Sequence, residues 1–314
     1  TGSEGGAGGA STLDLNVATG TAQAITTLTI TAGAGGDAGA TNTNIGAAGG
    51  VGGDALATVA GDLSGSVVLD DGSAGTSVDA GGAGGAGGTA TVTFDGETVQ
   101  TISSIITAAA DGEGTIIITG DEGSADLKTF SGAIGTNAIR IGTITSGVSA
   151  ALSNSKFTAA VYADTITHGV DSDWVDAAIT MDFDDNVGFT TMTVTGGNDS
   201  ATEVATITAA KNLTGTTIAL VDGTAGGSAA LTLDGSVAQV ISADITTADN
   251  DTNALTISNI HASGAKFTGN IGASNKELKT ITITNDDDGA GTTFADFNGN
   301  VYAPTIAITA AGAV

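Results

Sequence analysis

Short runs in which β-branched apolar residues alternate with threonine recur along the whole chain. Glycine, aspartate and asparagine separate these runs, as they do at turns between strands. No stretch shows the apolar spacing of an amphipathic helix. The pattern therefore predicts an all-β protein. The predicted strands cover residues 25–30, 66–69, 90–94, 114–119, 139–145, 178–183, 190–195, 204–208, 217–221, 254–258, 279–284 and 305–309.

The chain repeats itself at a distance of about 140 residues. Residues 157–166 and 297–306 match at six of ten positions, and the two tyrosines of the chain, Tyr162 and Tyr302, hold the same place in both. Other stretches match in the same order at nearly the same offset. These are 93–102 with 232–241, and 130–135 with 267–272.

Repetition and small side chains favour a repetitive β-solenoid, a β-helix-like array, over one thick core. A weaker subrepeat near 70 residues corresponds to three coils of about 23 residues each. In such a coil isoleucine and valine point inward and stack, while threonine hydroxyls form ladders on a flat outer face. The alternative is a series of tandem β-sandwiches. We divide the chain into a flexible or exchange segment (1–12), a Gly-rich β-repeat region (13–90), β-repeat block A (91–170), a connecting β-repeat region (171–230) and β-repeat block B (231–314).

Two glycine-rich stretches, 32–53 and 72–88, interrupt the strands. Disordered linker is the default interpretation of this composition. The three-residue Gly-Gly-Ala rhythm also fits close-packed extended chains, because glycine allows backbones to approach closely. The sequence leaves both interpretations open.

Charge is the strongest compositional signal. The chain has 34 acidic and seven basic residues among 314, a formal net charge of −27, and no cysteine. Such a chain repels phosphate backbones, which excludes nucleic acid as a partner. Without cysteine there are no disulfides or thiolate sites. No apolar run is long enough to predict a membrane span. The first residue is threonine, so we expect a removed leader or a fragment of a longer protein.

The Thr-Ile-Thr strands, the Asp-Gly turns, the acidity and the lack of cysteine together resemble the β-strand-repeat surface proteins of bacteria, of the S-layer, filamentous adhesin and surface-fibre type. The resemblance covers most of the chain and rests on composition and repetition. It implies an extracellular, cell-surface structural role and supplies no catalytic residues.

Dense acidic turns are candidates for calcium, which prefers six to eight oxygen ligands from carboxylates and carbonyls. The ordinary interpretation is that aspartate and asparagine simply favour turns. Two runs are the densest, and they give the candidate metal ligands Asp182, Asp184, Asp185, Asn186, Asp286, Asp287 and Asp288.

We predict no enzyme. The two histidines, His168 and His261, hold different positions of the repeat and are expected at the surface or in turns. A polysaccharide-active enzyme would want acidic groups in a groove beside Arg140. The repeated Phe157 and Tyr162 are expected in a core layer rather than as a stacking platform for a ligand.

The function expected from these features is an extracellular structural protein that assembles with copies of itself into a surface layer or fibre, bridged by cations. Cell-surface glycans are a further candidate partner. The alternative is an adhesin or phage-fibre stalk that serves as a spacer, and a polysaccharide-active enzyme comes last.

Overall fold

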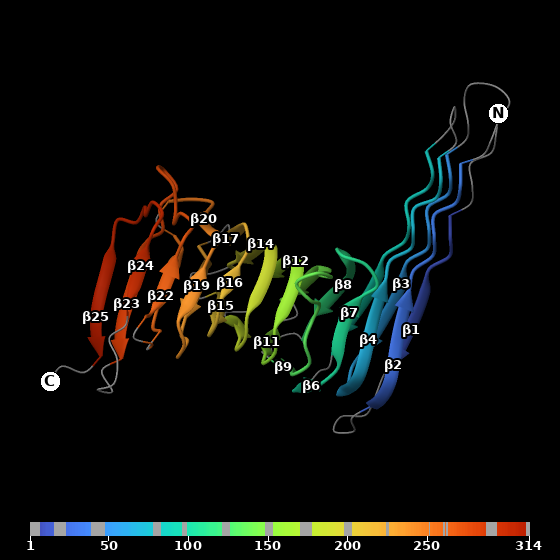
Figure 1. Ribbon diagram of the computed structural model, residues 1–314, viewed down its shortest axis with the longest axis horizontal. Helices are drawn as coiled ribbons and strands as arrows, with labels where there is room; N and C mark the ends of the chain where they lie inside the picture. The colour runs from blue at the N-terminus through green and yellow to red at the C-terminus, as the bar shows by residue number, and fades with distance from the viewer. Residues whose placement is uncertain are drawn as a thin grey trace.

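The computed structural model describes residues 7–15, 23–38, 48–77, 83–95, 99–120, 126–147, 153–169, 178–197, 203–223, 226–250, 252–259, 261, 263–286 and 294–311. This part of the chain is all β and contains no helix. Its strands lie one after another along the long axis, from β1 at one end to β25 at the other (Figure 1).

The strands form two long ladders. The 13-stranded sheet contains β1 (Ser11–Leu15), β3 (Ala55–Val59), β5 (Ala90–Phe94), β8 (Glu113–Ile118), β10 (Ile141–Ser146), β12 (Val161–His168), β14 (Val187–Thr195), β16 (Leu213–Thr214), β17 (Thr217–Val221), β19 (Gln239–Ile241), β20 (Asp244–Thr247), β22 (Ala265–Phe267) and β24 (Ala295–Phe297). The 12-stranded sheet contains β2 (Gln23–Thr31), β4 (Leu63–Asp70), β6 (Gln100–Ile102), β7 (Ile105–Ala108), β9 (Asp126–Phe130), β11 (Ser153–Phe157), β13 (Ile179–Phe183), β15 (Val204–Ala209), β18 (Ser228–Leu233), β21 (Ala254–Ile257), β23 (Thr280–Asp286) and β25 (Ile306–Ala311).

The pairings between these strands are parallel. The chain passes from one sheet to the other and returns to pair with its own previous coil, which is the arrangement of a β-solenoid. The predicted solenoid is therefore confirmed, and tandem sandwiches, which need antiparallel sheets, are wrong.

The length of a coil can be read from the register. Asp182 lies beside Lys156 of the preceding coil, 26 residues earlier, slightly more than the predicted 23. Near the N-terminal end the same step is longer: Thr101 donates to Asp62, 39 residues earlier. The difference arises because the early coils contain the glycine-rich stretches.

Inward positions alternate with outward ones in most strands, as in β13, where Ile179, Met181 and Phe183 are buried. Strands β10 and β12 each shift this alternation by one residue. Aromatic rings stack along the core. The ring centroid of Phe157 lies 4.9 Å from that of Phe130 and 4.9 Å from that of Phe183, both nearly parallel. Such pairs contribute about 0.5–1.5 kcal/mol each beyond burial.

The predicted core layer is confirmed for Phe157 and wrong for the tyrosines. Tyr162 and Tyr302 are only half-buried. Each follows an inward valine, so the alternation of a strand turns its ring outward. The Tyr162 ring lies against the backbone of the next coil, where a Cβ on Gly188 would meet its Cδ1 at 2.6 Å.

The sequence repeat does not coincide with the sheets. Phe157 belongs to β11 of the 12-stranded sheet, whereas its counterpart Phe297 belongs to β24 of the 13-stranded sheet. Phe130 in β9 and Phe267 in β22 are related in the same way. The members of these pairs lie 140 and 137 residues apart, which is five coils of 26 residues plus seven to ten more. One motif therefore builds two different sides of the coil.

Two buried glutamines make the same hydrogen bonds on these two sides of the coil. Gln100 Nε2 donates to the carbonyl oxygens of Val59 and Gly61, at 3.1 and 2.5 Å. Gln239, its counterpart in the repeat, makes the same pair of bonds to two carbonyls of an earlier coil, at 2.8 and 3.0 Å. Each glutamine satisfies two carbonyls at a corner, and buried backbone groups require such partners.

The glycine-rich stretches are ordered where the structure describes them. Residues 7–10, 32–38, 48–54, 71–77 and 83–89, here called the glycine arm, run side by side beyond the ends of the strands (Figure 1). Gly33 and Gly36 donate to the carbonyls of Gly53 and Gly50, at 2.7 and 2.6 Å. Donors three residues apart have the period of the polyproline II helix. The interpretation as ordered packing is therefore confirmed for these residues; 39–47 and 78–82 lie outside the described part.

Candidate functional site

The first predicted calcium cluster lies at the turn between β13 and β14, where its carboxylates form ion pairs with lysines. Lys156 Nζ contacts Asp182 Oδ2 at 2.6 Å and Asp184 Oδ1 at 2.8 Å. Partial burial favours the neutral amine, but the two carboxylates outweigh it and raise the pKa of Lys156 above its ordinary value. These two aspartates therefore already have a cationic partner.

The other half of this turn binds a second lysine. Lys211 Nζ contacts Asp185 Oδ1 at 2.9 Å, and the Asn186 backbone amide donates to the same oxygen at 2.7 Å. The hydrogen bond from Lys211 is the main reason that the pKa of Asp185 is lowered. Asp182, Asp184, Asp185 and Asn186 are thus adjacent, as predicted, but their described contacts are with lysine, with backbone and, between Asn186 Nδ2 and Asp185 Oδ1, with each other.

Asp234 adds negative charge next to this turn. Its own burial, together with the charges of Asp182 and Asp184, raises its pKa. The lysines therefore do not fully neutralise this part of the surface.

The second predicted calcium cluster lies mostly outside the described residues. Asp286 is the last residue of β23, and its side chain lies outside the described part; so do Asp287 and Asp288 altogether. Within the described ranges, no group of three or more His, Cys, Asp or Glu side chains is placed to hold a metal ion. Calcium at either turn stays a prediction.

Many other acidic and amide side chains in turns accept a hydrogen bond from the next coil. Thr101 N donates to Asp62 at 2.7 Å, Arg140 N to Asp111 at 2.9 Å, and Val240 N to Asn212 at 2.8 Å. These side chains extend the strand ladder around the corners, where the backbone lacks regular partners. Part of the acidity of the chain therefore has a structural role.

Arg140 lies directly before β10 and contacts Asp164. Its Nη1 is 3.6 Å from Asp164 Oδ1, and Thr190 bonds to both side chains, at 3.4 and 3.3 Å. An ion pair this exposed contributes at most about 1 kcal/mol.

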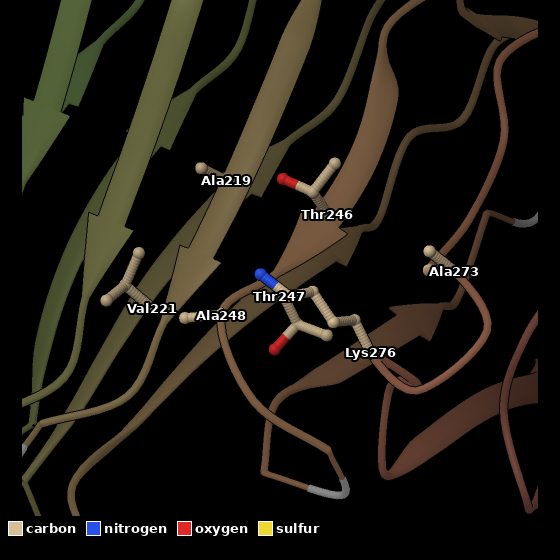
Figure 2. A pocket seen from close by; sticks show the side chains of 8 residues that line it. Ala219, Val221, Thr246, Thr247, Ala248, Ala273 and Lys276 are labelled. Carbon is tan, nitrogen blue, oxygen red and sulfur yellow. The ribbon is translucent and has the colours of Figure 1, made fainter.

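A shallow pocket of about 320 Å³ lies near the C-terminal end of the 13-stranded sheet. Figure 2 shows Ala219 and Thr246 on the sheet and Lys276 on a loop beside it. Lys276 is its one charged lining residue. Its lining residues are Ala219, Val221, Thr246, Thr247, Ala248, Gly272, Ala273 and Lys276. Small side chains with a single amine offer no acid–base pair for catalysis.

His168 is a residue that sequence reasoning placed wrongly. It was expected at the surface or in a turn, but it is fully buried at the end of β12, between Ser146 of β10 and Val194 of β14. The signal that could have placed it is its spacing of two from the inward Ile166, because the alternation shifts by one residue at Asp164 and Thr165. Burial, opposed in part by the backbone of Ile179, lowers the pKa of His168 from 6.5 to about 4.

The buried His168 makes the free energy of unfolding depend on pH. Because the unfolded state binds the proton more tightly, the contribution of the neutral imidazole is complete above pH 6.5. It is lost as the pH falls toward 4. The full loss is roughly 3 kcal/mol. We expect the His168→Val variant to be spared this loss. Urea unfolding of both proteins at pH 7.5 and pH 4.5 tests this, and a difference between them that does not change with pH would contradict it.

The described part of the chain has no helix that could span a membrane. No protein-family model matches the chain, and neither a curated protein nor a solved structure shows a significant match to it.

Proposed function

We propose that this protein is an extracellular structural subunit that stacks end to end with copies of itself into a fibre or surface layer. The observation that carries the proposal is an apolar core left open at β25, the last strand that the structure describes.

The open core is seen in the last coil. Leu233, Ile257, Ile283 and Ile308 follow one another in register across β18, β21, β23 and β25. The first two are completely buried, whereas Ile308 is 78% exposed. Ile306, in the same strand, is 50% exposed. The strand that would cover them is missing from the described residues, so this surface gains apolar burial by meeting another coil.

The opposite end offers a matching edge. Strands β1 and β2, the first strands of the two sheets that end in β24 and β25, each pair on one side only among the described strands, and Leu13 of β1 is 42% exposed. An unpaired parallel strand is a template for another strand. Contact between two different ends is heterologous and does not close, so it produces filaments.

Charge acts against association along the sides. A chain with net charge −27 repels its copies, and this repulsion is screened by salt and by bound cations. We propose that divalent cations such as calcium bridge carboxylates of neighbouring rods. If chelation at low ionic strength leaves bundles of rods intact, this part is wrong while end-to-end stacking still stands.

The stacking is tested by placing a charge on the open core. We expect Ile308→Lys to raise the concentration for half-maximal assembly roughly tenfold or more, because an apolar contact is lost and a charge must be buried. The measurement is sedimentation velocity over a concentration series.

The matched control is Val99→Lys. Val99 is also exposed, at 66%, but it lies before β6 in the interior of the rod rather than at an end. It should assemble like the wild type. Equal effects of both variants would overturn end-to-end stacking. A wild type that stays monomeric at all concentrations would also overturn it and would favour a stalk.

A further inference from the structure

A regular array of threonines covers the outer side of the 13-stranded sheet, away from the solenoid ends. It has two rows, and here it is called the threonine face. The first row consists of Thr91, Thr115, Thr143, Thr165, Thr191, Thr217 and Asp244. The second row consists of Thr93, Ile117, Thr145, Thr167, Thr193, Ala219 and Thr246. Eleven of these fourteen positions are threonine.

The spacing of the array is fixed by the sheet. Neighbouring strands lie about 4.8 Å apart, and outward residues of one strand about 6.6 Å apart. The residues between the two rows, including Ile116, Ile144 and Ile166, point inward and are almost completely buried, which holds the backbone in place. Threonine is stiff at χ1, so its methyl and hydroxyl keep their positions.

The hydroxyls of the array are left to water. Among the described residues, Thr246 is the one threonine of the face whose side chain bonds to protein, donating to the Ile218 carbonyl at 3.5 Å. The other threonines of the face are half-buried by their neighbours in the ladder. A regular array of this kind offers water hydrogen bonds and methyl contacts at regular intervals.

Charge is almost excluded from the face, although the chain carries −27 overall. Asp244, at the C-terminal end, is the one charged residue in the two rows. The Arg140–Asp164 pair borders the first row, because Asp164 lies within β12 directly before Thr165, and the loop with Lys276 lies beside the C-terminal end of the face (Figure 2). Charged groups orient water radially around themselves, so a neutral face permits a lattice-like arrangement instead.

We propose that the threonine face binds the surface of ice. Its repeats in two directions are close to the spacings of water molecules in that lattice, and its hydroxyls and methyls hold water in a matching order. A second copy of this chain fits less well, because it would bring two strongly acidic rods together and take hydroxyls out of water. A crystalline glycan would be expected to require aromatic side chains for stacking, and the two rows contain none.

The test uses the purified wild-type chain and two double variants with the same chemical change. Thr165→Lys with Thr167→Lys places charge in the middle of the threonine face. Thr206→Lys with Thr208→Lys places it on outward threonines of β15, in the other sheet. Partition into a slowly growing ice hemisphere and inhibition of ice recrystallisation are measured for each, and circular dichroism checks the fold.

The wild type and the β15 variant should enter the ice and slow recrystallisation. In the face variant, partition into ice and inhibition of recrystallisation should each fall at least tenfold, to the level of an inert acidic protein. If the double face variant does not fold, Thr167→Lys alone replaces it. A wild type excluded from ice, or equal losses in both variants, would overturn the proposal. Loss of assembly in the face variant would also overturn it, by making the face a contact between copies.

Discussion

Replacing Phe157 by alanine should lower the free energy of unfolding by about 3–5 kcal/mol, a loss comparable to a large part of the stability of an ordinary domain. Phe157 is 1% exposed and lies between two rings, each with its centroid 4.9 Å away. Truncation removes both stacked contacts and leaves a cavity in a thin core that closely spaced parallel strands cannot collapse to fill. Urea unfolding followed by circular dichroism measures the change.

The matched control for this prediction is Phe294→Ala. Phe294 is 53% exposed, and its described hydrogen bond is made by its backbone, which accepts from Ala265 N. We expect a change below about 1 kcal/mol, measured at a concentration where the chain is monomeric. Equal losses in the two variants would show that the aromatic stack does not support the solenoid.

Replacing Gly52 by alanine should open the glycine arm without unfolding the sheets. A Cβ at this position would overlap the Gly33 carbonyl oxygen and lie 2.7 Å from Gly88 N, so two backbones must separate. Overpacking of this kind costs about 1–3 kcal/mol. The amides of Gly33 and Gly88, which donate to Gly53 and Gly33, should then exchange with deuterium roughly ten- to a hundredfold faster.

The control for the arm is Gly9→Ala, because a Cβ on Gly9 meets nothing within 4 Å. It should leave amide exchange unchanged throughout the arm. If Gly52→Ala also leaves exchange unchanged, the arm is not packed through close glycine contacts. Faster exchange throughout the sheets would show instead that the arm and the solenoid unfold together.

The strands and the solenoid were predictable because one physical rule governs them. Alternation of apolar residues with threonine, as at 190–195 within β14, places one set of side chains inward and the other outward. Small side chains suit a thin, repeated core. The threonine ladders follow from the same alternation once the coils are in register.

The offset between the sequence repeat and the coils of the solenoid was not predictable in the same way. The sequence relates Phe157 to Phe297, but it does not reveal that a spacing of 140 residues differs from a whole number of coils. That depends on coil length, which is set by how the corners pack. The open core at Ile308 and the outward turn of Tyr162 depend on the same geometry.

Two further features depend on tertiary contacts that composition does not encode. Glycine-rich sequence is compatible with disorder or with close packing, and the positions of neighbouring backbones decide between them, as at Gly36 and Gly50. Turn aspartates are compatible with calcium or with structural bonds. Lys156 and Lys211 decide the contacts of Asp182, Asp184 and Asp185, although the first two are 26 and 28 residues from their lysine in sequence.

Electron cryomicroscopy of the purified protein with millimolar calcium is the most direct test of end-to-end stacking. Stacking predicts filaments in which the strand spacing of about 4.8 Å continues without a break from the β25 end of one molecule to the β1 end of the next. Discrete rods, each the length of one solenoid and unchanged as the protein concentration rises, would contradict it.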